Sequence, residues 1–275
     1  MDAYTDFASV YDTFMDETPY QEWADFIEEL IHEYGVSVPY KNKKVQVESG
    51  ADSQELLNTE KNLVVDIGCG TGTLTEMLAA KGYDMIGIDL SQEMLQIAID
   101  KKETNQSDVL YLCQDMRELD LYSTAGTIIS VCDSVNYLLE KEELGETFRL
   151  GNNYLDPGGV FIFDFNTQYK YEEVIGDTTI AENREDCSFI WENYYHEEEQ
   201  INEYDLTVFV KEQNGLSRKF EENHYQRGYT LAEMIRMIER AGLCLIKAID
   251  ADTHEEPTPE SERIYIVARE QGKGC

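Results

Sequence analysis

Short apolar runs alternate with helical patterns through the middle of the chain. The runs are each of a length suited to a buried strand and cover residues 62–67, 84–89, 108–113, 126–131 and 159–165. Between them, apolar residues spaced three and four apart predict helices near 73–81, 91–103 and 140–154. Asp156-Pro157-Gly158-Gly159 predicts a turn before the fifth strand. This order predicts an α/β fold in which a mostly parallel sheet is covered on both faces.

The N-terminal part carries a different pattern. Apolar residues at helical spacing from Tyr4 to Met15 and from Tyr20 to Ile31 predict two helices within residues 4–34. Between Val36 and Lys61 the pattern gives way to polar residues, which predicts a long loop. We assign that loop no function.

After Asn166 the rhythm changes to extended segments. Residues 188–195, 203–212 and 217–229 read as strands, with a turn signal at Asn214-Gly215. A helix at 231–241 and strands at 243–250 and 262–269 then resume the first pattern. We therefore expect a core made of residues 1–166 and 230–275, with residues 167–229 inserted as a small antiparallel sheet.

Charge and cysteine spacing exclude several classes of function. The chain has 22 basic and 56 acidic residues, a net charge of −34 that repels nucleic acid and anionic membranes. Lys41, Lys43 and Lys44 are the densest basic cluster and read as a solvated loop. The six cysteines show no metal-ligand spacing, and no segment reads as a signal or a membrane span. We expect a cytoplasmic protein with free thiols and no metal, nucleic acid or membrane partner.

The sharpest motif is Asp66-Ile67-Gly68-Cys69-Gly70-Thr71-Gly72, where an apolar strand gives way to a helix. Glycines permit positive φ and close backbone approach, and the following helix presents free N–H groups. Asp89 ends the next strand, 19 positions after Gly70, where a carboxylate suits ribose hydroxyls. The motif predicts a site for a nucleoside-linked ligand.

The glycine spacing separates two cofactor classes. A dinucleotide fingerprint has its third glycine five residues after the first, but here that position is Thr73 and the glycine falls at Gly72. An acidic residue two positions before the first glycine also points away from NAD. A nicotinamide-dependent oxidoreductase therefore remains only as an alternative.

Three motifs in order resemble the class I S-adenosylmethionine-dependent methyltransferases: Asp66 to Gly72, Ile86-Gly87-Ile88-Asp89-Leu90-Ser91, and Gln114-Asp115-Met116. The resemblance implies a Rossmann-like fold with a seven-stranded, mostly parallel sheet, S-adenosylmethionine as cofactor and S-adenosylhomocysteine as product. It also implies that Asp66 orders the glycine loop and the methionine end, that Asp89 binds the ribose, and that Asp115 and Met116 contact adenine. Cys69 is expected to contribute its backbone, and Met94 either packs on adenine or belongs to the core.

Two N-terminal motifs sharpen the resemblance. Tyr11-Asp12-Thr13-Phe14-Met15 and Tyr20-Gln21-Glu22-Trp23 look like those of bacterial small-molecule methyltransferases, and the chain is distantly similar to glycine N-methyltransferase-like enzymes. The likeness implies that the N-terminal helices close over the cofactor cleft, with Tyr11 and Trp23 near the sulfonium. Packing between helices is the alternative for both rings.

The segment Cys132-Asp133-Ser134-Val135-Asn136-Tyr137 follows the fourth strand, at the edge where such enzymes place the methyl acceptor. It lacks the Pro-Pro-aromatic motif of enzymes that methylate amino groups in DNA. In-line methyl transfer draws much of its acceleration from orientation, so a dedicated base is not required. If one is used, Asp133, Tyr11 or His224 could serve. For His224 the alternative is a strand residue facing solvent.

These observations predict methyl transfer to nitrogen or oxygen of a small molecule, in a monomer or homodimer. The alternative is a cofactor-binding protein without transferase activity. The inserted sheet is expected to form a lid, with Trp191, Tyr195 or Arg227 facing the methyl group. Arg227 could bind a substrate carboxylate or pair with nearby glutamates, and the aromatics could equally form an oligomer interface. The residues expected at the cofactor are Tyr11, Trp23, Asp66, Gly68, Cys69, Gly70, Asp89, Leu90, Met94, Gln114, Asp115, Met116 and Cys132, and those expected in catalysis are Tyr11, Asp133 and Arg227.

Overall fold

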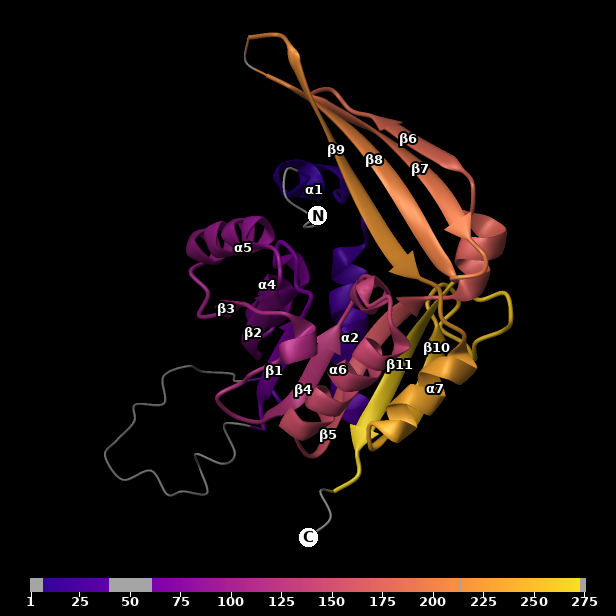
Figure 1. The fold of residues 1–275 in the computed structure, drawn as a ribbon. Helices are drawn as coiled ribbons and strands as arrows, with labels where there is room; N and C mark the ends of the chain where they lie inside the picture. Colours follow the sequence, from indigo (N-terminus) through magenta and orange to yellow (C-terminus); the bar gives the residue numbers. More distant parts are fainter. Residues whose placement is uncertain (1–6, 40–60, 213, 273–275) are drawn as a thin grey trace.

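A computed structural model of the chain describes residues 7–39, 61–212 and 214–272 (Figure 1). The expected helix beginning at Tyr4 lies partly outside these residues. Most of the expected 36–61 loop lies outside them too, including Lys41, Lys43 and Lys44.

Seven strands form the main sheet in the order β10-β11-β5-β4-β1-β2-β3. Strands β1 to β5 are parallel to their neighbours among themselves, and β11 runs antiparallel to both β5 and β10. This is the predicted Rossmann-like fold with a mostly parallel sheet. The bounds are β1 Leu63–Ile67, β2 Asp84–Asp89, β3 Leu110–Cys113, β4 Ala125–Ser130, β5 Leu155–Asn166, β10 Leu243–Asp250 and β11 Arg263–Glu270.

Helices cover both faces of this sheet because alternate strand residues point to opposite sides. Along β5, Phe161 and Phe163 pack on the face covered by α6 and α7, while Val160 and Ile162 pack on the face covered by α2 and α4. Helix α5 lies against α4 and strands β2 and β3 (Figure 1). The helices are α1 Ala8–Phe14, α2 Tyr20–Tyr34, α4 Thr73–Ala80, α5 Gln92–Asn105, α6 Lys141–Tyr154 and α7 Leu231–Arg240.

The largest difference from the predicted strand boundaries is at the start of β5. β5 begins at Leu155, four residues before the expected start. The pairing with β4 jumps from Leu155 to Val160, and Gly158 adopts φ +79°. The predicted Asp156–Gly159 turn is therefore a bulge inside the strand.

The second sheet is an antiparallel meander of residues 179–227, in the order β6-β7-β8-β9. It rises from the edge of the main sheet where β5 ends, and α1 lies against it (Figure 1). The sequence did not predict β6, whose residues are mostly exposed and show no alternation, or the short π-helix Lys170–Val174 before it. The bounds are β6 Thr179–Asn183, β7 Cys187–His196, β8 Ile201–Lys211 and β9 Ser217–Arg227.

The inner face of the second sheet divides into an apolar and a polar part. At the apolar part, Phe189, Leu206 and Val208 pack with Val10 and Phe14 of α1. The polar part lies nearer the main sheet and consists of buried side chains, namely Asn193, Asn202, Tyr204, Glu222, His224 and Gln226. Burial of so many polar groups requires that they be paired with one another or with the core.

Within the described residues, no helix is long and apolar enough to cross a membrane. In that same part of the chain, no group of three or more His, Cys, Asp or Glu side chains could hold a metal ion. Five cysteines are described there, and all are free thiols.

Candidate functional site

The glycine loop after β1 adopts backbone conformations that only glycine takes readily. Gly68, Gly70 and Gly72 have φ of +75°, +54° and +72°. A Cβ on Gly68 would lie 2.6 Å from the side chain of Ser134, whereas a Cβ on Gly70 would meet no atom within 4 Å. The loop therefore packs tightly on one side and leaves room for a ligand on the other.

Asp89, at the end of β2, fixes that loop. Its carboxylate accepts hydrogen bonds from the N–H groups of Gly70, at 2.7 Å, and Ser91, at 2.8 Å. Burial raises the pKa of Asp89 above its usual range, and the backbone donors oppose this rise. Two carboxylate oxygens offer about four acceptor positions, so the group retains acceptors for ligand hydroxyls.

Asp66 lies in β1 just before the loop, and Cys69 lies within the loop between Gly68 and Gly70. The Asp66 carboxylate accepts a hydrogen bond of 2.6 Å from Thr75 Oγ1 on α4. Burial, with a smaller contribution from the charge of Asp89, raises the pKa of Asp66 to about 7. Burial also raises the pKa of the Cys69 thiol well above its usual value, so Cys69 is not a thiolate nucleophile at neutral pH.

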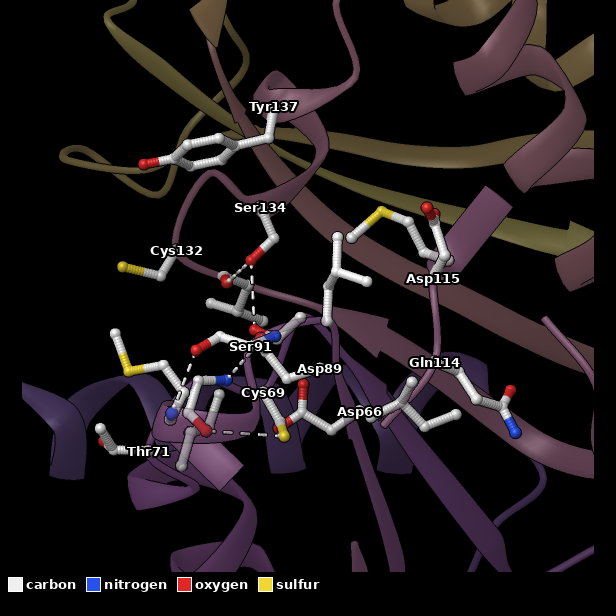
Figure 2. A pocket seen from close by; sticks show the side chains of 18 of the residues that line it. Asp66, Cys69, Thr71, Asp89, Ser91, Gln114, Asp115, Cys132, Ser134 and Tyr137 are labelled. Atoms are coloured by element: carbon white, nitrogen blue, oxygen red, sulfur yellow. Dashed lines mark hydrogen bonds between the residues drawn. The ribbon is translucent and has the colours of Figure 1, made fainter. Parts of the chain in front are cut away.

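A cavity of about 680 Å³ opens at the carboxyl ends of β1 to β4 (Figure 2). The strand order reverses between β1 and β4, and open α/β sheets bind ligands at such a switch point. All thirteen residues expected at the cofactor line this one cavity, from Tyr11 and Trp23 on the N-terminal helices to Cys132 after β4. Tyr20 and Ser134 also line it, although the sequence motifs that contain them gave them no role, and so does Leu138, which lies outside those motifs.

The side chains after β3 are held by protein partners. Asp115 accepts hydrogen bonds from the backbone and guanidinium of Arg117, and this ion pair lowers the pKa of Asp115. The Gln114 carboxamide exchanges two hydrogen bonds with the backbone of Asp120. Gln114 therefore shapes the loop that it belongs to, while it also lines the cavity.

The Tyr-Asp-x-x-Met motif on α1 points in three directions. Tyr11 lines the cavity, with its hydroxyl 4.0 Å from Cys132 Sγ. Asp12 accepts a hydrogen bond of 2.7 Å from Thr71 in the glycine loop, and it also pairs with Lys101. Phe14 stacks edge-on against Phe189 of the second sheet, with ring centroids 4.8 Å apart. Helix α1 therefore joins the glycine loop to the second sheet.

Asp133 lies beside the cavity but does not line it. Cys132 and Asp133 both adopt left-handed conformations, with φ of +66° and +52°, a strained arrangement for residues other than glycine. Asp133 Oδ1 pairs with Arg263 at 2.6 Å, and its Oδ2 accepts from Gln226 at 2.7 Å. Of the residues expected in catalysis, only Tyr11 reaches the cavity, because the Asp133 carboxylate is turned into this ion pair.

The structure does not bring the expected lid residues to the cavity. The Arg227 guanidinium donates to the Leu139 carbonyl. Trp191 packs edge-on against Tyr204, with centroids 4.9 Å apart, and Tyr195 lies beside Gly176. The expectation that these side chains face the methyl group is corrected, because packing within the insertion and the hydrogen bond from Arg227 to the core direct them elsewhere.

His224 was named from the sequence as a possible base, but its buried position was not predicted. It is 5% exposed, so the interpretation of a strand residue facing solvent is wrong. Its Nδ1 lies 3.3 Å from the hydroxyl of Tyr137, which lines the cavity. The even-numbered positions of β9 share one face, and this period of two was the signal that places Glu222 and His224 together.

Comparison with known proteins decides the family. A family model described as a methyltransferase domain matches residues 64–159. A chain named as a methyltransferase, YqeM of Bacillus subtilis, is 34% identical over 267 residues, which cover 97% of this chain and 96% of that one. The chain belongs to the class I S-adenosylmethionine-dependent methyltransferases. The similarity therefore extends over nearly the whole of this chain.

Two further relatives of the methyltransferase differ in how much they cover. A crystal structure of an S-adenosylmethionine-dependent methyltransferase from Clostridium acetobutylicum covers 98% of this chain and 100% of its own, at 27% identity and a TM-score of 0.80. The dTDP-3-amino-3,4,6-trideoxy-α-D-glucopyranose N,N-dimethyltransferase of Streptomyces venezuelae is 32% identical over 114 residues, 42% of this chain and 46% of that one. The first match extends over the residues of the second sheet, whereas the second match covers less than half of the methyltransferase.

The cavity of the methyltransferase fits its methyl donor. Its volume lies within the roughly 300–1,000 Å³ of small-molecule sites. A half-buried carboxylate at Asp89 and the open space beside Gly70 suit a ribose and an extended chain. The aromatic rings of Tyr11, Tyr20 and Trp23 line the part of the cavity next to Cys132, where electron-rich faces favour a sulfonium cation.

Proposed function

We propose that the protein transfers a methyl group to nitrogen or oxygen of a small molecule bound between the cavity and the polar part of the second sheet. The observation that carries this is the row of buried polar side chains above the cavity, with Tyr137 on the cavity wall touching His224 of that row. A recognition site for a small polar molecule needs a few polar groups in an otherwise closed environment. The net charge of −34 disfavours nucleic acid as the acceptor.

The Streptomyces relative supports an amino group as acceptor, since its name describes dimethylation of an amino sugar nucleotide. The match covers less than half of each chain, so it supports the reaction type and leaves the sugar itself open to test. Methyl transfer needs a lone pair aligned with the methyl carbon and little further chemistry from the protein.

We propose the following roles for the cavity residues. Asp66 and the glycine loop hold the methionine end of the cofactor, and Asp89 accepts hydrogen bonds from the ribose hydroxyls. Leu90, Met94 and Met116 enclose the adenine, beside Asp115. Tyr11, Trp23 and Cys132 surround the sulfonium. The cofactor supplies an activated methyl carbon, and the protein contributes orientation and exclusion of water.

We also propose that residues 167–229 act as a lid on a core made of residues 1–166 and 230–275. The support is the packing of α1 between the glycine loop and the second sheet, which links the insertion to the cofactor cavity. Substrate choice then depends on the inner face of β7 to β9.

Cofactor selectivity gives the first test. Saturating S-adenosylhomocysteine, at about 100 times its Kd, stabilises a folded protein by about 2.7 kcal/mol. For a chain of this size we expect the melting temperature to rise by roughly 5 °C or more, and NAD at the same concentration to leave it unchanged. Thermal shift measurements with both ligands check this. Stabilisation by NAD alone would contradict the assignment of the cavity.

Excision of the second sheet tests the lid. Gly176 and Gly228 both lie against Tyr171, so a short Gly-Ser linker can join Ile175 to Gly228. We expect the shortened protein to lose turnover and to bind S-adenosylhomocysteine more weakly, because α1 loses the surface that Phe14 packs on. Calorimetry and an assay of S-adenosylhomocysteine release measure the two effects.

The same variant distinguishes a lid from an oligomer interface. Light scattering reports the mass of both proteins. Full activity together with a change from dimer to monomer would reject the lid and favour an interface.

A further inference from the structure

A row of three side chains leads from the buried part of β9 to the cavity wall. Glu222 and His224 are neighbours on the inner face of β9, and Tyr137 stands in the short η2 helix Ser134–Tyr137 after β4. Glu222 and His224 are only 6% and 5% exposed. Figure 2 shows the Tyr137 side chain on the side of the cavity away from Asp66 and Asp89.

The distances define an order of contacts. Tyr137 Oη lies 3.3 Å from His224 Nδ1, and Glu222 Oε2 lies 3.3 Å from His224 Nε2. The second value is an ion-pair distance rather than a good hydrogen bond, and contacts of this kind often tighten when substrate binds. Glu222 Oε1 accepts a hydrogen bond of 2.9 Å from the Phe7 N–H, which fixes the carboxylate.

The position of Glu222 favours one imidazole tautomer of His224. A neutral imidazole carries one N–H, and a carboxylate facing Nε2 favours the proton on that nitrogen. Nδ1 is then a lone-pair acceptor aimed at the Tyr137 hydroxyl. The same logic orients the histidine in Ser-His-Asp triads.

We propose that Tyr137 takes a proton from the methyl acceptor while it passes its own proton to His224, which Glu222 orients and stabilises as a cation. This rests on the proposed function. Tyr137 is the catalytic residue, and Glu222 and His224 are positioning residues that act through it. The Tyr204 ring also faces His224, with centroids 6.4 Å apart, and the next residue on this face of β9, Gln226, donates to Asp133 of the Asp133–Arg263 pair.

The step balances in protons and electrons. The O–H or N⁺–H bond of the acceptor breaks and its proton forms a bond to Tyr137 Oη, as the Tyr137 proton moves to His224 Nδ1. The freed lone pair of the acceptor forms the bond to the methyl carbon, and the electrons of the broken carbon–sulfur bond stay on sulfur. The relay therefore suits acceptors that arrive protonated, such as an alkylammonium or an unionised phenol.

The tautomer is measurable without any acceptor. The chain has four histidines, so ¹⁵N-histidine labelling gives four imidazole spin systems, and the spectrum of His224→Gln assigns the one of interest. At neutral pH we expect His224 to carry its proton on Nε2, and Glu222→Gln to shift the population toward Nδ1–H. Protonation at Nδ1 in the unaltered protein would overturn the proposal.

Two probe acceptors separate a proton relay from a merely structural role. Benzylamine is mostly ammonium at neutral pH and must lose a proton, whereas 4-nitrophenol is largely phenolate in mildly basic buffer. We expect His224→Gln to lower kcat/KM for benzylamine by roughly 10²- to 10⁴-fold. For 4-nitrophenol, kcat/KM of the variant should stay within about threefold of that of the unaltered protein. An equal loss for both would overturn the proposal.

Matched variants complete the design. His196 on β7 pairs with Glu203 at 2.8 Å on the exposed side of the same sheet, so His196→Gln repeats the substitution away from the cavity and should leave both rates unchanged. Tyr137→Phe combined with His224→Gln should be no slower than His224→Gln alone, because the two act in one relay. Calorimetric binding of S-adenosylhomocysteine shows that each variant is folded.

The outcomes also separate this proposal from the proposed function. If the unaltered protein methylates neither probe nor any member of a wider amine and phenol panel, small-molecule transfer fails as a function. The histidine tautomer then still confirms or rejects the geometry of the relay.

Discussion

Replacing Asp89 with alanine is expected to raise the Kd for S-adenosylhomocysteine by roughly 100-fold. A hydrogen bond to a charged group contributes about 1.5–3 kcal/mol, and Asp89 is the acceptor proposed for both ribose hydroxyls. The variant also removes the acceptor of the Gly70 and Ser91 N–H groups, so the glycine loop loses the bonds that hold its shape. Calorimetric titration measures the affinity.

The control for this variant lies on the same strand. Asp84 begins β2 and Asp89 ends it, so Asp84→Ala makes the same change at the edge of the sheet away from the cavity. We expect its affinity to stay within about twofold of the original, an energy difference of about 0.4 kcal/mol. An Asp89→Ala protein that is folded and binds with unchanged affinity would remove Asp89 from the site.

Replacing Arg263 with methionine is expected to destabilise the fold by about 3–5 kcal/mol. Arg263 is largely buried and pairs with Asp133 at 2.6 Å and with the fully buried Asp164 at 3.4 Å. Lys170 is the other cation near this cluster, and burial lowers its pKa. Loss of the guanidinium leaves the carboxylates of Asp133 and Asp164 near Lys170, whose charged form is disfavoured by burial. Urea denaturation measures the free energy of unfolding.

The loss of unfolding free energy in the Arg263→Met protein should grow as the pH increases. Burial raises the pKa of Asp164 above its value in the unfolded chain, while the charge of Arg263 opposes that rise. Without Arg263 the pKa rises further, so the folded state binds a proton that the unfolded state has released, and stability falls as pH increases above about 4. Denaturation at about pH 5 and about pH 8 compares the two conditions.

An exposed arginine provides the comparison. Arg149 pairs with Glu146 on the surface of α6, and we expect Arg149→Met to leave the unfolding free energy unchanged within error. Equal stability of Arg263→Met and Arg149→Met, or a loss that shrinks toward high pH, would show that the buried ion pair is not a determinant of the fold.

The cavity proposed for the cofactor could be predicted because its residues follow one another in short motifs. Gly68, Gly70 and Gly72 need positive φ, and no other residue type would supply three such positions in five residues. Asp89 and Asp115 could be placed because each stands at the end of an apolar strand, and parallel strands bring their carboxyl ends to one edge. The spacing of these residues along the chain was therefore enough to predict that they lie together.

The polar network could not be predicted in the same way. Asp133, Arg263 and Gln226 come from three elements far apart in sequence, and only the packing of the second sheet brings them together. The direction of a side chain is also set by its partners, which is why Arg227 turns to the Leu139 carbonyl although its strand was recognised. Patterns of apolar residues locate elements but carry no information on which polar groups will pair.

The meeting of the two ends of the second sheet beside Tyr171 has an evolutionary consequence. An insertion that leaves and re-enters a fold at nearly one point can change in length and sequence without altering the register of the strands around it. Lineages can therefore diversify the residues of β7 to β9 while the strand ends proposed to hold the methyl donor stay the same. Duplicated copies of such a gene would be expected to diverge first at the inner face of the second sheet and last at the glycine loop.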